Sequence, residues 1–287
     1  MHNVIVNAHA RRVKKIVAAM EERFREHGVQ YRIFPTRQAG DAETFARSLS
    51  EAGEREFIVT GGDGTLNEVI SGLADPGVCT VGLVPAGTGN DFAASLQIPH
   101  GSRALELILD RAPQPGDYIE CGGRRSINIV GTGIDVEILR RCAGMRFGTN
   151  KGKYFRSLVA TLAHYRGTKL LVTVNGETKE YFALIAAVCN GRQLGGGIPL
   201  CPVAKADDGR LELVVVDSPK RRRIPFELLR LMRGKLLERP ITHHIPCSQA
   251  TISSPDGPIF VQYDGEIGQA QTLDARLVSG KLKMYRG

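Results

Sequence analysis

The sequence predicts two domains: an open α/β domain with a mainly parallel sheet, followed by a β-rich antiparallel sandwich. Up to about Asp117, short β-branched runs alternate with helical patterns, which is typical of a parallel sheet covered by helices. Beyond that point strand patterns dominate and helices are few. The chain has 287 residues, of which 42% are hydrophobic, enough for two cores. We expect domains at 1–119 and 120–279, with the last strand, about 280–287, as a segment that can return to the first domain.

The elements of the first domain follow from hydrophobic periodicity. The segment 12–27 carries Val13, Ile16, Val17, Met20 and Phe24 at helical spacing, so one face of that helix is apolar. Strands are predicted at 4–7, 31–36, 57–60 and 80–84, and helices at 12–27, 41–50, 65–74, from 91, and at 102–111.

The second domain is predicted from its strands and turns. Dipeptides such as Asn175-Gly176 and Ser279-Gly280 are typical turns between strands. Helices are expected at 151–166 and 222–238. Strands are expected at 125–130, 169–175, 180–189, 211–217, 249–254, 259–263, 271–278 and 281–285.

The strand at 57–60 runs into Gly61-Gly62-Asp63-Gly64-Thr65, and a helix pattern begins at once. Glycines let a backbone turn tightly and point several N–H groups at one anion, and the helix N-terminus adds partial positive charge. Asp63 suits such a cradle if a cation accompanies the anion, as in phosphate with Mg²⁺. The alternative is a tight turn in which Asp63 caps the helix.

A second glycine loop, Gly87-Thr88-Gly89-Asn90-Asp91, follows the next strand. Both loops lie at the carboxyl edge of the predicted sheet, where open α/β folds bind ligands. Two such loops, each with Thr and Asp, favour a nucleotide site. The sequence has no GxxxxGK[ST] P-loop, and the Gly131-Thr132-Gly133 run lacks the third glycine of a dinucleotide-binding fingerprint, so we interpret it as structural.

Two acidic pairs lie in the second domain. Asp264-Gly265-Glu266 ends a strand pattern; it is a hairpin turn, or it supplies the base that a phosphoryl transferase needs for the attacking hydroxyl. Asp207-Asp208-Gly209 is either a turn or a metal site.

The composition limits the class of partner. The net charge of +8 favours anionic partners, whereas the absence of Trp and the 6% aromatic content argue against nucleic acid bound by stacking. Six scattered cysteines without a CxxC pair indicate reduced thiols, and no signal peptide or membrane span is evident. We expect a cytoplasmic protein, at most peripheral to the inner face of a membrane. Its oligomeric state stays open, a homodimer included.

The segment 220–239 holds eight Lys or Arg residues against Glu227 and Glu238. Helical spacing puts Pro225, Leu228, Leu229, Met232 and Leu236 on one side. This pattern is either an ordinary surface helix or a docking face for anionic lipid headgroups.

The motifs GGDGTLNEV at 61–69 and PAGTGNDFA at 85–93 together resemble the diacylglycerol kinase catalytic domain family, which includes the sphingosine kinases. The resemblance continues through NIVGTGID at 128–135, Asn190-Gly191, Gly195-Gly196-Gly197, PVAKADDGRL at 202–211 and Asp264-Gly265-Glu266. It covers essentially the whole chain. It implies an N-terminal domain of the NAD kinase and phosphofructokinase type.

The resemblance also implies ATP-dependent, Mg²⁺-assisted phosphorylation of a lipid hydroxyl, with the lipid presented at a membrane surface and the active cleft between the domains. Asp264 or Glu266 would be the base, with Asp63 as a further catalytic residue. Asp63, Asp91 and Asp117 match acids linked to Mg²⁺, and Asp208 matches a second metal site with the carbonyls of Lys205 and Arg210. ATP would be held by Asn7, Thr36, Gly61, Gly62, Asp63, Gly64, Thr65, Leu66, Asn67, Glu68, Gly87, Thr88 and Asn90.

One segment departs from the family pattern: Asn7-Ala8-His9-Ala10-Arg11 stands where the family has an Asn-Pro-x-(Ser/Ala)-Gly loop. The positive charge of Arg11 or Arg12 could take the place of backbone N–H groups of that loop, which puts nucleotide preference in question. The rival functions are an NAD kinase, which shares the GGDGT loop, and a non-catalytic regulator that binds nucleotide or lipid.

Overall fold

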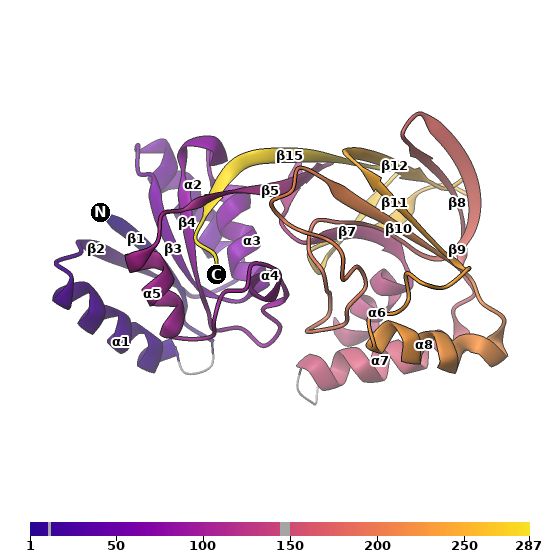
Figure 1. Ribbon diagram of the computed structural model, residues 1–287, viewed down its shortest axis with the longest axis horizontal. Coiled ribbons are helices and arrows are strands. Elements are labelled where there is room, and N and C mark those ends of the chain that lie inside the picture. The colour runs from indigo at the N-terminus through magenta and orange to yellow at the C-terminus, as the bar shows by residue number, and fades with distance from the viewer. Residues whose placement is uncertain (11–12, 144–149) are drawn as a thin grey trace. The chain divides into compact units, whose positions relative to one another are not determined.

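The computed structural model describes residues 1–10, 13–143 and 150–287 (Figure 1). It divides into two compact units. Unit 1 comprises Met1–Asp117 and Ser279–Gly287, and unit 2 comprises Tyr118–Val278. Among the described residues, no helix combines the length and apolar character that crossing a membrane requires.

Unit 1 is built on a parallel sheet, as the sequence predicted. The strands β1 (His2–Asn7), β2 (Tyr31–Thr36), β3 (Glu56–Gly61) and β4 (Thr80–Pro85) lie in the order β4-β3-β1-β2. The end of β15 (Thr272–Met284) pairs parallel with β4. The helices are α1 (Val13–Glu26), α2 (Asp41–Glu51), α3 (Asp63–Gly72), α4 (Asp91–Ser95) and α5 (Arg103–Asp110), with a 3₁₀ turn at Pro76–Val78.

The register of this sheet brings the strand ends together. Asn7 is paired with Thr36, and Gly61 with Pro85, each at the carboxyl end of its strand. Every residue of β4 is buried, which is typical of a parallel strand covered on both faces. The segments that follow β1, β3 and β4 therefore start from one edge of the sheet.

Unit 2 is a β sandwich-like unit around one long strand, β9 (Glu177–Cys189). Its first half pairs with β8 (Thr168–Val174), and its second half pairs with β7 (Ile129–Gly133) and β10 (Leu211–Asp217). These pairings are antiparallel, which confirms the expected fold class. The other strands are β5 (Gln114–Cys121), β6 (Arg124–Ser126), β11 (Thr242–Cys247), β12 (Gln249–Ser253), β13 (Ile259–Tyr263), β14 (Glu266–Ala270) and the first part of β15.

Two apolar clusters fill unit 2. One lies among the strands and includes Val130, Val188 and Leu213. The other lies between the strands and the helices α6 (Ile134–Ala143), α7 (Asn150–His164) and α8 (Ile224–Met232). Figure 1 shows these three helices gathered on one side of the strands of this unit.

Several predicted elements differ from the observed ones. The helix expected at 222–238 is a 3₁₀ turn at Arg221–Arg223 and then α8, which ends before Gly234 because that glycine has φ +68°. The strands expected at 271–278 and 281–285 are one strand, β15. α6 and β11 were not predicted. The sequence of β11, Thr-His-His-Ile-Pro-Cys, lacks a clear alternation of apolar and polar residues.

Candidate functional site

The carboxyl edge of the unit 1 sheet is organised around Thr65. The Asn7 side-chain amide donates a hydrogen bond to the Thr65 hydroxyl, with an Nδ2–Oγ1 distance of 3.1 Å. Thr65 lies directly over Gly61, where an added Cβ would come 2.7 Å from the Thr65 Cβ. The glycine is therefore needed at this position so that the helix can begin close above the strand end.

The two glycine loops touch through their backbones. A Cβ on Gly87 would lie 2.5 Å from the Gly62 Cα, a separation that real side chains do not reach. Asn90 closes the second loop, because its Oδ1 accepts from the Gly87 N–H at 3.0 Å and its Nδ2 donates to the Gly87 carbonyl at 2.9 Å. Asn90 has φ +57°, a conformation that Asn tolerates better than most residues.

Asp63 joins the two loops. Its carboxylate oxygens accept the backbone N–H groups of Asp91 and Phe92 at 3.0 and 2.9 Å. These donors belong to the first residues of α4, so Asp63 caps the helix that follows the second loop. The sequence interpretation had placed this cap on α3, the helix that Asp63 itself begins. The carboxylate thus has a structural role whatever else it binds.

The outer side of this assembly is open to a ligand. Gly64 is exposed, and an added Cβ there would meet nothing within 4 Å. The Thr88 side chain is exposed as well. Gly62, the N-cap residue of α3, has no side chain to bond the first N–H groups of the helix, and the helix dipole is positive at this end. These features fit the phosphate groups of a nucleotide.

Several other residues expected to contact ATP are buried or bonded within unit 1. Leu66 is fully buried in the core and its N–H donates to the Gly62 carbonyl, while a Glu68 carboxylate oxygen accepts from the Ala42 N–H at 3.3 Å. Thr36 and Asn67 are also buried.

The unusual loop after β1 is closed by Asn7 itself. Its Oδ1 accepts the His9 N–H at 3.0 Å, and its carbonyl accepts the Ala10 N–H. This Asx-turn reverses the chain direction at a position where the family has Pro and Gly. Arg11 and Arg12, considered above as substitutes for backbone N–H groups, lie outside the described residues.

The acids assigned to metal do not form a cluster. Within the described ranges, no three His, Cys, Asp or Glu side chains come close enough to hold a metal ion, so Asp63, Asp91 and Asp117 form no preformed Mg²⁺ cage. Asp117 is buried and accepts the Gly280 N–H at 2.8 Å. Asp208 accepts the Arg210 N–H at 3.2 Å and lies 3.5 Å from its guanidinium, while Lys205 is exposed.

Asp264 and Gly265 form the two-residue turn between β13 and β14, as the turn interpretation predicted. Both have positive φ, +49° and +94°, which suits a hairpin turn. The Asp264 carboxylate accepts three backbone N–H groups, those of Ile127, Asn128 and Ile129, at 2.6–3.1 Å. It therefore fastens the hairpin to the segment that leads into β7.

Glu266 is different in kind. Its side chain is 61% exposed and lies 3.3 Å from Arg124, which is itself exposed. An exposed ion pair of this type holds its partners weakly. Of the two acids considered as a base, Glu266 is the one whose carboxylate is not committed to the fold.

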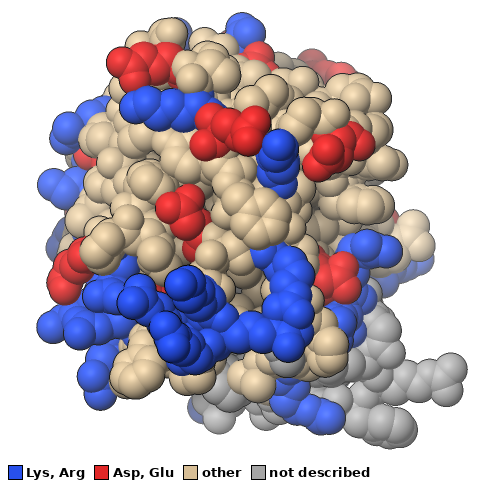
Figure 2. Space-filling view, turned by 90° about the vertical axis from the view of Figure 1, so that its right-hand side faces the viewer, with Lys and Arg blue, Asp and Glu red and all other residues tan. Residues whose placement is uncertain are grey.

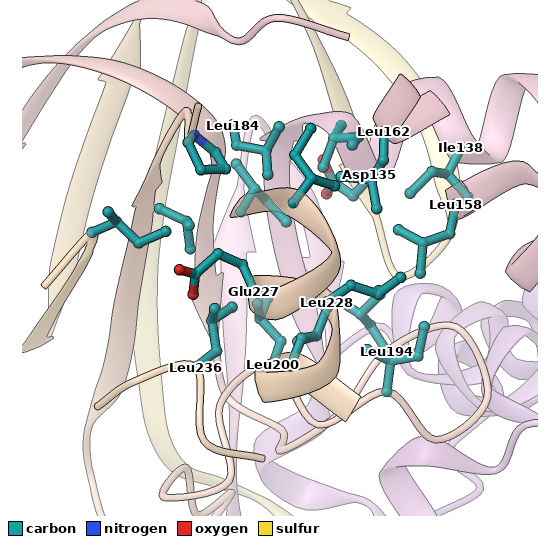
Figure 3. Close-up of a pocket in the computed structure, with 18 residues that line it drawn as sticks. Asp135, Ile138, Leu158, Leu162, Leu184, Leu194, Leu200, Glu227, Leu228 and Leu236 are labelled. Atoms are coloured by element: carbon teal, nitrogen blue, oxygen red, sulfur yellow. The ribbon is translucent and has the colours of Figure 1, made fainter. Parts of the chain in front are cut away.

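Unit 2 also contains an apolar pocket. The second domain was expected to supply the lipid site, but the sequence analysis did not identify the residues that line this pocket. It is formed by α6, α7, α8 and the strands beneath them; it encloses a cavity of about 70 Å³ and is partly open to solvent. Figure 3 shows Leu158, Leu162, Leu184, Leu194 and Leu228 around this space. Its lining is that of a site for an apolar ligand.

Two acids line this pocket. Glu227 is buried, and its two oxygens accept from the Arg239 guanidinium at 2.9 and 3.0 Å, which fixes α8 to the following loop. Asp135 is 3% exposed, and neither carboxylate oxygen makes a hydrogen bond of normal geometry. Burial raises the pKa of Asp135 to about 6, against smaller lowering effects of the Val136 N–H and the Gln262 amide.

Comparison with protein families agrees with this architecture. The model of the diacylglycerol kinase catalytic domain matches residues 2–121, and that of the YegS C-terminal NAD kinase beta sandwich-like domain matches residues 128–286. The chain belongs to the diacylglycerol kinase catalytic domain family, with a C-terminal domain of the YegS type.

Relatives named "Probable lipid kinase YegS-like" match much of the chain. The protein of Xanthomonas campestris pv. campestris is 30% identical over 91% of this chain and 88% of its own length. That of Chromohalobacter salexigens is 33% identical over 68% of this chain, and the match spans 64% of the relative.

Solved structures share the fold. A diacylglycerol kinase from Bacillus anthracis superposes with a TM-score of 0.74 at 23% identity, covering 100% of this chain and 96% of that one. An NAD kinase from Archaeoglobus fulgidus in complex with ATP gives a TM-score of 0.54 at 11% identity, covering 100% and 94%.

Proposed function

We propose that this protein is an ATP-dependent kinase that phosphorylates a lipid hydroxyl, with a diacylglycerol-like acceptor. The observation that carries the proposal is the apolar pocket of unit 2, in a chain whose unit 1 carries the glycine loops of a kinase family. A nucleotide acceptor such as NAD would gain little from walls made of leucine and isoleucine, whereas an acyl chain gains by leaving water.

In the nucleotide half, ATP supplies the phosphoryl group, and the residues that fit its phosphates are those left open at the sheet edge. The Gly64 backbone, the N–H groups that begin α3 and the exposed Thr88 hydroxyl are suited to this role. Asp63, Asn90 and Asn7 hold the loops in place by the hydrogen bonds described above. Mg²⁺ is part of the proposal as an ion carried with the nucleotide, since it commonly binds through phosphates, water and one or two carboxylates.

In the acceptor half, we assign the pocket to the acyl chain and Glu266 to the acceptor hydroxyl. Asp135 gives the pocket a hydrogen-bond acceptor suited to a donor group on the lipid, whereas Glu227, the other acid of the lining, is bonded to Arg239. Glu266 is exposed and able to take up a proton, whereas Asp264 is occupied by three backbone donors.

The test is labelled ATP with a total lipid extract and, separately, with NAD, followed by identification of the phosphorylated product. We expect a phosphorylated lipid and no NADP. Phosphorylation of NAD alone would assign the chain to the NAD kinases. ATP binding without turnover on any lipid would favour a non-catalytic regulator.

The pocket assignment has its own test. Leu228→Trp, from the half-buried inner side of α8, should fill the pocket and raise KM for lipid about tenfold or more, with ATP affinity unchanged. Val159→Trp is the control, because Val159 is 47% exposed on α7. Equal effects of the two substitutions would remove the pocket from the proposed function.

A further inference from the structure

The outer side of α8 exposes three large apolar side chains. Phe226, Leu229 and Met232 are 68%, 47% and 43% exposed. Their spacing of three residues places them along one side of the helix. Large apolar residues that are exposed singly need no explanation, but a cluster on one helix indicates an interaction surface.

Basic side chains surround this cluster. Figure 2 looks at the side of the molecule on which α8 lies and shows Lys and Arg gathered into one band. Of the acids in this segment, Glu227 is buried against Arg239 and only Glu238 is exposed. Seven basic residues of the segment 220–235, all of them described by the structure, are exposed and form no ion pair: Lys220, Arg221, Arg222, Arg223, Arg230, Arg233 and Lys235.

The inner side of the same helix is apolar too. Ile224, Leu228 and Leu231 line the pocket of unit 2. Apart from Glu227 and Arg230, α8 consists of apolar residues, which lie on both its inner and its outer side, and such sides are normally buried. α8 has a core on one side only, so its other side is suited to an apolar phase.

We infer that the segment 220–235, the docking segment, binds the surface of an anionic lipid bilayer. Phe226, Leu229 and Met232 enter the boundary between headgroups and acyl chains, and the basic side chains contact lipid phosphates. The inference goes beyond the proposed function, because it concerns vesicle binding without ATP or turnover.

Charge and apolarity together select this partner. A second copy of the chain would bring the same positive surface against this one in a two-fold dimer, which is repulsive. A nucleic acid would match the charge but would leave Leu229 and Met232 without an apolar phase. An anionic bilayer satisfies both.

The experiment is sedimentation of the full chain with phosphatidylcholine vesicles, with and without phosphatidylglycerol, at about 0.1 M salt. The wild type should bind the anionic vesicles and bind pure phosphatidylcholine much more weakly. The triple variant Arg222→Glu, Arg230→Glu, Arg233→Glu should lose about 100-fold or more in affinity. The double variant Phe226→Ser, Leu229→Ser should lose at least about tenfold.

Matched controls separate this surface from charge or exposure in general. Arg103→Glu with Lys281→Glu and Lys283→Glu reverses three exposed charges in unit 1, and Phe182→Ser removes another exposed aromatic (56%). Both controls should bind vesicles like the wild type. If the triple Glu variant does not fold by circular dichroism, the corresponding Arg→Gln variant replaces it.

Three outcomes would overturn the inference. Wild-type-like binding by folded variants of the docking segment would do so, as would equal losses in the controls. The third is binding to short single-stranded DNA that exceeds vesicle binding and does not change in Phe226→Ser, Leu229→Ser, which would assign the surface to nucleic acid. Kinase activity is measured separately, so an inactive protein that still binds vesicles leaves this inference standing.

Discussion

Asp135 offers the sharpest test of the energetics of this structure. Its carboxyl group is buried in the apolar pocket, and burial raises its pKa from 3.8 to about 6. The difference of about two pKa units corresponds to about 3 kcal/mol, at 1.36 kcal/mol per unit, by which folding disfavours the charged form. The substitution Asp135→Asn removes the ionisation and keeps the shape.

The sign of the pH dependence follows from the direction of the shift. Between about pH 4 and pH 6 the folded chain binds more protons at Asp135 than the unfolded chain. The contribution of this group to the unfolding free energy therefore falls as pH rises from about 4 to about 6. Above about pH 6 the destabilisation by the charged carboxylate has its full size. At pH 7.5 we expect Asp135→Asn to be more stable than the wild type by up to about 3 kcal/mol.

The assay is urea unfolding of both proteins at pH 4 and at pH 7.5, with Asp256→Asn, an exposed residue of unit 2, as the surface control. The difference in unfolding free energy between the wild type and Asp135→Asn should be near zero at pH 4 and reach its full size at pH 7.5. A constant difference across this range would refute the reasoning. If Asp135 also receives a donor group of the lipid, the stabilised variant loses lipid turnover while its ATP binding is unchanged.

Three further predictions concern the two acids Asp264 and Glu266, the contact between the two glycine loops, and the cap formed by Asp63. Asp264→Asn should lower the unfolding free energy by about 2–4 kcal/mol, because backbone donors lose a charged acceptor. Glu266→Gln should change the unfolding free energy by less than about 0.5 kcal/mol but lower kcat about 10²–10⁴-fold. Gly87→Ala should lower the melting temperature and nucleotide affinity through the clash of the two loops, with Gly64→Ala as a control of unchanged melting temperature. Asp63→Asn should lower the unfolding free energy by about 1–2 kcal/mol through the loss of a cap. Urea unfolding, steady-state kinetics and equilibrium ATP binding check these predictions. A larger loss of stability in Glu266→Gln than in Asp264→Asn, or in Gly64→Ala than in Gly87→Ala, would contradict the assignments.

Features that depend on local backbone conformation could be predicted from the sequence. Asn175-Gly176 and Asp264-Gly265 form hairpin turns with positive φ at both residues, as their residue types indicate. The parallel strands of unit 1 were predictable because their buried runs alternate with helical patterns. The family was predicted from the two glycine motifs and the fold class from the alternation of strand and helix patterns, and both predictions were confirmed.

Features that depend on distant pairs of residues could not be predicted. The Asp63 carboxylate bonds the start of α4, 28 and 29 residues away, and the Asp264 carboxylate bonds the segment 127–129. Sequence spacing shows that a carboxylate is present, but it does not show which backbone donors come within reach. The set of Asp63, Asp91 and Asp117 as acids linked to Mg²⁺ was expected from the family resemblance, and the described structure does not gather these three acids into a metal-binding cluster.

The sequence by itself determined the fold class, the two glycine loops and the family, because these depend on residue order and on local backbone preferences. Only the tertiary structure decided the roles of the acids. It places Asp63 and Asp264 in hydrogen bonds that hold the fold, leaves Glu266 exposed, and buries Asp135 in a pocket assembled from separate helices and strands. The physical reason is that a carboxylate's chemistry is set by its burial and its donors, and both come from residues far away in the chain.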